Sequence, residues 1–216
     1  MRRLWLSCLL FLAAVPAAAQ QRVRLEVSAT EPAPESGPRR PLVRTPGVLR
    51  DARWLESLQN TFPLRLQFRV EIWGVRTDWF DALERAFQWE TVVQYDPLLD
   101  EFTKTVLFGG SPRTVQRFST LQELERDLER ATQVGITPAG PGDYYFTAGL
   151  QLGTLTDDEV EELEQFLRGG NPGPGGGEAG AVRRAARRLL LRVGGLPTAQ
   201  LEARSPRFTI PLPPGD

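Results

Sequence analysis

The sequence predicts a mainly β fold, an antiparallel β-sandwich of immunoglobulin-like or C2-like type decorated by three to four short helices. Three observations lead to this prediction. Several segments alternate apolar and polar residues with a period of two, which is typical of half-buried strands. Neighbouring strands lack the spacing that helical crossovers between parallel strands require. The 216 residues include 20 glycines and 18 prolines, which indicates many turns and at least one linker.

The first elements of the predicted domain are a strand, a connector and a helix. Residues 22–29 alternate apolar and polar side chains, so they form a predicted strand. Residues 31–47 contain five prolines, and this density forbids a helix and predicts an extended connector. A short helix is expected over residues 51–60, where Asp51 is a favourable N-cap residue.

The clearest strand pattern spans residues 62–72, where six large apolar side chains alternate with polar ones. A slip of one residue would expose all six, so the register of this strand is strongly specified. Residues 77–87 are expected to form a helix that packs its large apolar residues inward, namely Trp79, Phe80, Leu83 and Phe87. Residues 89–95 and 102–108 then read as two strands of a hairpin with a longer loop.

The chain continues with further short elements. Residues 113–118 are expected to add a strand, and a capping box opens a predicted helix over residues 120–133. Alternation returns in residues 143–152, which predicts another strand. A terminal strand is expected over residues 201–210, interrupted by Pro206.

Two more helices are expected between the last two strands. An acidic helix is predicted over residues 156–168, followed by a Gly/Pro linker at 170–180 and a basic helix at 181–193. The basic helix has its arginines on one half of the helical wheel: Arg183, Arg184, Arg187, Arg188 and Arg192. These arginines could face anionic lipid, an acidic partner or solvent, or could pair with glutamates of the acidic helix.

The first nineteen residues are typical of a bacterial secretory signal peptide. Arg2 and Arg3 precede an apolar run over residues 4–15, and small residues lead to an expected cleavage site between Ala19 and Gln20. An uncleaved anchor is the alternative. Residues 20–216 are then expected to form a single domain that is secreted across the inner membrane and is periplasmic or extracellular, with no integral membrane span.

Residue types that are missing exclude several chemistries. The chain has no histidine, which removes Ser-His-Asp triads and histidine-ligated zinc or haem. The one cysteine, Cys8, lies in the predicted signal peptide, so neither a disulfide nor a cofactor is expected in the mature chain. The one lysine, Lys104, is expected to face solvent on its strand. The net charge of −1 would not attract nucleic acid, which is not expected as a partner.

Two groups of side chains are candidate sites. Asp96, Asp100 and Glu101 cluster at a hairpin end, where they could bind calcium or act in glycoside hydrolysis, although turn formation also explains them. Trp73 falls on the polar side of its strand. It could present a flat surface to a sugar, or it could pack at the edge of the core.

Three segments resemble the bacterial family DUF4390, which comprises secreted envelope proteins. They are WLESL at residues 54–58, FPLRLQFRVEIW at 62–73 and WETVVQYDPLLDEF at 89–102. The resemblance covers roughly residues 48–108. It implies an extracytoplasmic location and a sandwich fold, and it implies no catalytic residue.

The sequence therefore favours a non-enzymatic extracytoplasmic module that binds another envelope protein or serves as an accessory in an envelope complex. One alternative is a carbohydrate-binding domain or a carboxylate-based glycan-processing domain. Another is a peripheral protein that binds anionic lipid through its Arg-rich helix.

Overall fold

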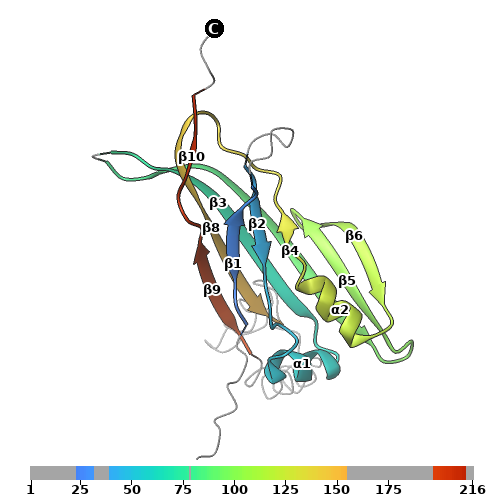
Figure 1. Ribbon diagram of the computed structural model, residues 1–216. Coiled ribbons are helices and arrows are strands. Elements are labelled where there is room, and N and C mark those ends of the chain that lie inside the picture. The colour runs from blue at the N-terminus through green and yellow to red at the C-terminus, as the bar shows by residue number, and fades with distance from the viewer. Residues whose placement is uncertain (1–22, 32–38, 78, 155–196, 213–216) are drawn as a thin grey trace, which may run out of the picture.

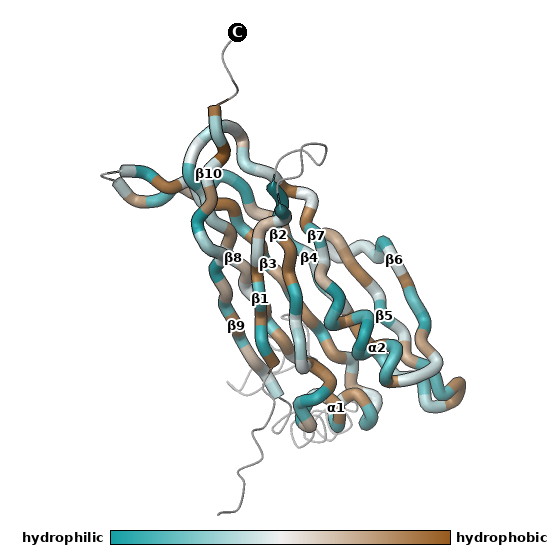
Figure 2. Tube along the Cα trace, viewed as in Figure 1, coloured by the Kyte–Doolittle hydropathy of each residue, from teal (hydrophilic) through white to brown (hydrophobic). Residues whose placement is uncertain are grey.

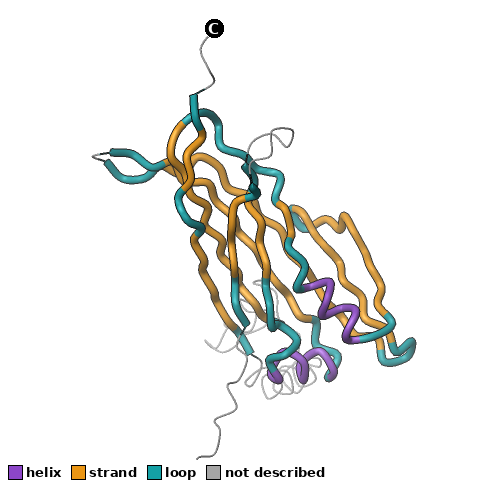
Figure 3. Tube along the Cα trace, in the orientation of Figure 1, coloured by secondary structure: helices purple, strands orange, loops and turns teal. Residues whose placement is uncertain are grey.

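In the computed structural model, the structure describes residues 23–31, 39–77, 79–154 and 197–212, which form two antiparallel sheets and two helices (Figures 1 and 3). The first strands are β1 (Glu26–Ala29), β2 (Pro41–Arg44), β3 (Leu64–Gly74), β4 (Ala82–Asp96) and β5 (Glu101–Phe108). The later strands are β6 (Ser111–Phe118), β7 (Thr132–Gln133), β8 (Gly142–Gly153), β9 (Ala199–Arg204) and β10 (Phe208–Ile210). The helices are α1 (Ala52–Gln59) and α2 (Leu121–Leu128). The described chain is mostly β, as predicted.

The two sheets differ in size. The larger has the strand order β10-β8-β3-β4-β5-β6, and β9 also pairs with β8, whereas the smaller has the order β1-β2-β7. The small sheet and both helices lie on one face of the large sheet (Figure 1). We call the opposite face of the large sheet the outer face. Within the described residues, neither helix is long and apolar enough to cross a membrane.

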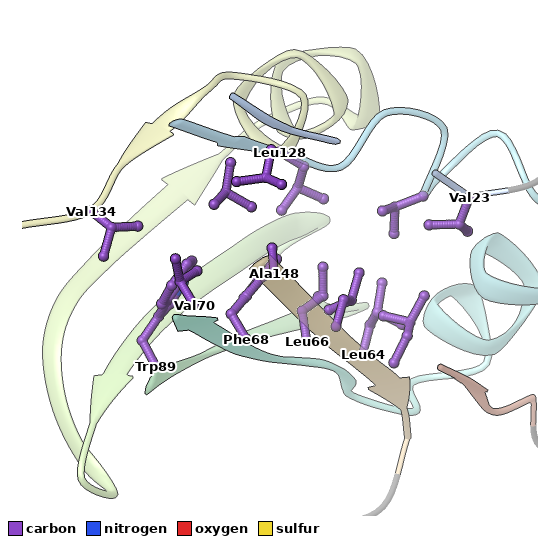
Figure 4. Close-up of a cluster of buried hydrophobic side chains, with 14 of the residues drawn as sticks. Val23, Leu64, Leu66, Phe68, Val70, Trp89, Leu128, Val134 and Ala148 are labelled. Atoms are coloured by element: carbon purple, nitrogen blue, oxygen red, sulfur yellow. The ribbon is translucent and has the colours of Figure 1, made fainter. Parts of the chain in front are cut away.

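The hydrophobic core fills the space between these two layers (Figure 4). Leu64, Leu66, Val70 and Ile72 of β3 are fully buried there, which confirms the register predicted for this strand. Val43 of the small sheet belongs to the same core cluster. Burying one such side chain contributes about 1.5–3 kcal/mol, so the alternation of β3 fixes which face of the large sheet is covered.

Both described helices begin where their capping residues predict. The Asp51 side chain accepts a hydrogen bond from the backbone N–H of Arg53, at 3.1 Å, and caps α1. Thr120 Oγ1 accepts one from the N–H of Glu123, at 3.3 Å, and caps α2. The tube of α2 is mostly hydrophilic in Figure 2, because its leucines are its only apolar residues.

Helix α2 is shorter than predicted. It ends at Leu128, the last leucine that it buries, rather than at residue 133. Residues 132–133 instead form β7, whose backbone pairs with Leu42 and Val43 of β2. Pairing with a strand distant in sequence therefore replaces the last turn of the predicted helix.

The predicted helix over residues 77–87 is wrong. Residues from Ala82 onward belong to β4, which pairs with β3 along its length and places Phe87 opposite Val70. This pairing satisfies the backbone of the segment and buries Trp89. The described residues therefore contain two helices rather than three to four. The expected helices at 156–168 and 181–193, the linker at 170–180 and the signal peptide at 1–19 lie outside the described residues.

Strands form within both of the Pro-containing segments, the expected connector and the terminal strand. Within the expected connector, Pro41–Arg44 forms β2 and pairs with β1 and β7, so this part of the connector belongs to the small sheet. The terminal strand is interrupted at Pro206 as predicted. On either side of the interruption, β9 and β10 pair with successive parts of β8. Ser205 bridges the gap, because its N–H donates to the carbonyl of Phe146 at 2.9 Å and its Oγ accepts from the N–H of Phe146.

Candidate functional site

Strand register brings polar side chains into rows across the outer face. These side chains come from the positions between the buried or half-buried residues of β3, β4, β8 and β9. One row crosses the sheet as Glu202, Gly149, Arg69 and Gln88. The next crosses it as Gln200, Gln151, Gln67 and Glu90, and we call this set the glutamine row.

The outer face is hollowed along these rows. Depressions of about 450 and 560 Å³ adjoin each other and share Arg69, Gly149 and Glu202 in their linings. We call them together the outer-face groove. It extends from the glutamine row to Trp73 and Tyr145. Gly149 has no side chain in the middle of its row, which leaves this part of the sheet surface open.

Trp73 lies at one end of the outer-face groove, on the polar side of β3 as predicted, and is half-buried. Its indole Nε1–H donates to Glu71 Oε2 at 2.9 Å and lies 3.2 Å from Thr147 Oγ1. Arg69 Nε donates to the other oxygen of Glu71 at 2.6 Å. The Glu71 carboxylate therefore fixes the orientation of the indole.

Burial of Glu71 opposes ionisation of its carboxyl group. The hydrogen bonds from Arg69, Trp73 and Thr147, together with the charge of Arg69, outweigh this effect, so the pKa of Glu71 lies below its ordinary value. The group is consequently a stable anion near neutral pH. A general acid in glycoside hydrolysis needs the opposite shift, with its pKa raised toward neutrality.

Tyr145 of β8 stands beside Trp73. The two rings are parallel to within 4°, with centroids 6.4 Å apart, and we call this pair the aromatic ledge. Tyr145 is buried, and the Arg204 guanidinium lies 3.5 Å from the centroid of its ring. Its hydroxyl donates to Asp81 at 3.0 Å. Burial and this hydrogen bond raise the pKa of Tyr145, which keeps its hydroxyl protonated.

The acidic cluster at the β4–β5 hairpin forms part of a turn. Asp96 Oδ1 accepts from the N–H groups of Leu98 and Leu99, at 2.9 and 3.3 Å. Asp100 accepts from the Tyr95 hydroxyl at 2.8 Å, while Glu101 starts β5 opposite Asp96. Within the described ranges, no group of three or more acidic or cysteine side chains is arranged to hold a metal ion. Calcium binding at these residues stays a hypothesis.

Lys104 does not face solvent as predicted. Its side chain lies on the core side of β5 and forms an ion pair with Asp127 of α2, and both side chains are mostly buried. Val106 and Phe108 of β5 also pack against the core. Lys104 lies two and four residues before them, so its side chain points to the same side of the strand. The single lysine is a structural residue of the β5–α2 contact.

A second exposed feature is the tip of the β3–β4 hairpin, which projects from the body of the fold (Figure 1). Trp79 and Phe80 lie there with exposed fractions of 74% and 85%, and their rings meet edge to face. They were expected to pack inward on a helix, so the structure corrects their position.

Sequence reasoning identified Trp73 and missed the rest of the outer-face groove. The alternation of residues 62–72 and 143–152 already places Gln67, Gln151 and Gly149 on a polar face, but only the register between strands brings them together. The basic-helix candidates lie outside the described residues: Arg183, Arg184, Arg187, Arg188 and Arg192.

Comparison of the chain with family models, curated proteins and solved structures finds no match.

Proposed function

We propose that the protein is a non-enzymatic extracytoplasmic binding module and that the outer-face groove holds its ligand. The observation that carries this proposal is the groove itself, which is open, polar and built on paired strands. Gln67, Arg69 and Glu71 belong to β3, which is hydrogen-bonded to a neighbour on both sides, so their positions are set by the sheet. Ligand sites that exist before binding avoid the entropy cost of ordering the chain.

The electrostatics favour binding over catalysis. Glu71 has a lowered pKa, and Glu90 is paired with Arg65 at 2.7 Å. The Glu71 carboxylate is therefore suited to accept hydrogen bonds from a ligand rather than to transfer a proton at neutral pH, and the Glu90 carboxylate is already engaged by Arg65. Binding to an envelope component is consistent with the expected signal peptide and with the resemblance to DUF4390. The signal peptide, the DUF4390 resemblance and the immunoglobulin-like or C2-like type of sandwich all stay predictions.

Site-specific photo-crosslinking in the native envelope tests the proposal. A photoreactive residue is placed at Gln88 or Gln200, which line the outer-face groove, or at Thr114, an exposed position on β6. We expect adducts, detected as mass shifts, from the two groove positions. Adducts from Thr114 alone would contradict the proposal.

The two glycines on the outer face of β8 supply a matched pair of blocking variants. A Cβ at Gly149 would come no closer than 3.9 Å to its surroundings, and a Cβ at Gly153 would meet nothing within 4 Å. Neither has a left-handed backbone, so both accept a side chain without strain. Gly149→Trp fills the outer-face groove, whereas Gly153 lies outside its lining. We expect Gly149→Trp to abolish the groove adducts and Gly153→Trp to preserve them.

A further inference from the structure

We infer that the ligand of the outer-face groove is a neutral oligosaccharide that stacks on Trp73 and hydrogen-bonds to the glutamine row. This inference rests on the proposed function and names the chemical class of its ligand.

The first argument is charge balance. Arg69 is paired with Glu71, and the Glu90 carboxylate at the far end is paired with Arg65. On β9, Arg204 pairs with Asp81 at 3.9 Å, and Glu202 lies two residues before it on the same face. Two arginines and three glutamates line the groove, and Arg65 and Asp81 beside it add one charge of each sign, so the groove has little excess charge with which to attract an anionic or cationic ligand.

The second argument is the chemistry of the glutamine row. A carboxamide side chain both donates and accepts hydrogen bonds, as does a sugar hydroxyl. Gln67, Gln151 and Gln200 are direct neighbours across three strands, so they present a line of alternating donors and acceptors. A polyhydroxylated ligand can satisfy such a line without bringing in any charge.

The third argument is the aromatic ledge. The apolar C–H face of a sugar ring carries partial positive charge and packs against the electron-rich face of an aromatic ring. Tyr145 is buried beside Arg204, whereas Trp73 is only half-buried. The indole is therefore the ring that a ligand reaches, and Glu71 acts as the positioning residue that holds it.

The dimensions favour several sugar units. Tyr145 and Gln151 mark the ends of the outer-face groove along β8, and six residues of strand span about 20 Å. The groove also lies on a sheet face, where backbone groups already pair with neighbouring strands. An extended peptide would instead find its main-chain partners at a sheet edge. A short oligosaccharide fits these constraints better than a monosaccharide or a peptide strand.

The test is titration of the purified chain with defined neutral hexasaccharides, namely the β-1,4-glucose, β-1,4-N-acetylglucosamine, α-1,4-glucose and β-1,4-xylose hexamers. Binding is followed by calorimetry and by the indole N–H resonance of Trp73 in NMR spectra. We expect at least one hexamer to shift this resonance and to bind at least tenfold more tightly than its monosaccharide. Affinity should change less than twofold between 0.05 and 0.5 M NaCl, because the ligand is uncharged.

Variants assign the binding to the groove. Gly149→Trp and Trp73→Ala should each weaken it at least tenfold. Gly153→Trp, one row beyond the glutamine row, and Trp79→Ala, at the hairpin tip, alter positions outside the lining of the groove and should change binding less than twofold. Gly149→Trp adds a side chain to open space, so it keeps the test decisive if Trp73→Ala does not fold.

Two results separate the inference from the proposed function. If none of the four hexamers binds while the groove still gives photo-adducts that Gly149→Trp removes, the oligosaccharide assignment is wrong and the binding site stands. If both experiments fail with folded protein, both proposals are wrong. Hexamer binding that is insensitive to Gly149→Trp would also overturn the inference, because the sugar would then bind elsewhere.

Discussion

Lys104 and Glu71 illustrate how neighbouring side chains in the fold set the role of a polar residue. Lys104 lies on the core side of β5 because Asp127 of α2 neutralises it there. Glu71 is held on the outer face by donors from β3 and β8, and these donors lower its pKa. In both cases the side chain is ordered by charge pairing, so removing one partner affects the other directly.

The ion pair between Lys104 and Asp127 is expected to contribute to stability. Asp127→Ala leaves the ammonium group on the core side without its partner, and we expect the free energy of unfolding to fall by about 3 kcal/mol. Combining Lys104→Met with Asp127→Leu should recover most of this loss. Arg50→Ala, which removes the exposed ion pairs with Glu125 and Glu129, should cost clearly less than Asp127→Ala. Urea unfolding measures all of these, and equal losses for Asp127→Ala and Arg50→Ala would contradict the argument.

The lowered pKa of Glu71 predicts a pH-dependent contribution to stability. A carboxyl group whose pKa is lower in the folded chain stabilises the fold above its unfolded-state pKa, and this contribution is lost as the pH falls through the folded-state value. We therefore expect Glu71→Gln to be less stable than the parent at pH 7, with the difference shrinking at acid pH. Urea unfolding at pH 7 and 3 measures it, with Glu202→Gln as the control. A difference that stays constant with pH would refute the assignment.

Among the elements, the β3–β4 hairpin departs most from its sequence-based prediction. Its apolar residues recur at helical spacing, yet Trp79 and Phe80 lie at an exposed tip while Phe87 and Trp89 continue into a strand. Periodicity over one segment does not include the hydrogen bonds that β3 offers to β4. The bulge at Ile72 and Trp73 shifts the register by one residue, which no local pattern predicts.

Because Trp79 and Phe80 are exposed at the tip, we expect their substitution to affect stability much less than substitution of Trp89, which is buried in the same hairpin. Trp79→Ser and Phe80→Ser should each change the free energy of unfolding by less than about 0.5 kcal/mol, because neither side chain is in the core. Trp89→Ser should cost about 3–5 kcal/mol, since Trp89 is buried and stacks on Phe68 with ring centroids 4.5 Å apart. Thermal unfolding distinguishes these expectations. A large loss for Trp79→Ser would favour the inward-packing helix instead.

Where a single strand buries one face, the sequence is sufficient to predict it. The six apolar residues of 62–72 determine β3, and the capping residues Asp51 and Thr120 determine where α1 and α2 begin. The outer-face groove could not be predicted in this way, because Gly149, Gln67 and Gln200 come from three strands and become neighbours only through strand pairing. Trp73 could be predicted as a candidate because its position on the polar side of β3 is visible within one segment.

Across the whole molecule, the large sheet is covered on one face and open on the other, and its strands differ in how many neighbours they have. β3 pairs with both β4 and β8 over nearly all its residues. β6 lies at the end of the sheet, pairs with β5 alone, and is exposed along almost its entire length. The centre of the sheet is therefore its most constrained part, and the outer-face groove is built there.

Hydrogen exchange should follow this arrangement. Backbone amides of β3 and β8 are expected to exchange most slowly, and those of β6 fastest among the strands of the large sheet. Mass spectrometry of peptides after deuterium labelling, at low protein concentration, measures the order in which the strands exchange. Protection of β6 as strong as that of β3 would mean that another chain or segment covers the β6 edge.

The position of the single lysine makes the protein a reporter of its own unfolding. An endoprotease that cleaves only after lysine has one target bond in the chain, following Lys104, and in the folded state this bond lies within paired strand β5 beside α2. Cleavage into two fragments therefore requires β5 to open. The rate at which these fragments appear would report, from one bond and without any label, how often the contact between β5 and α2 comes apart.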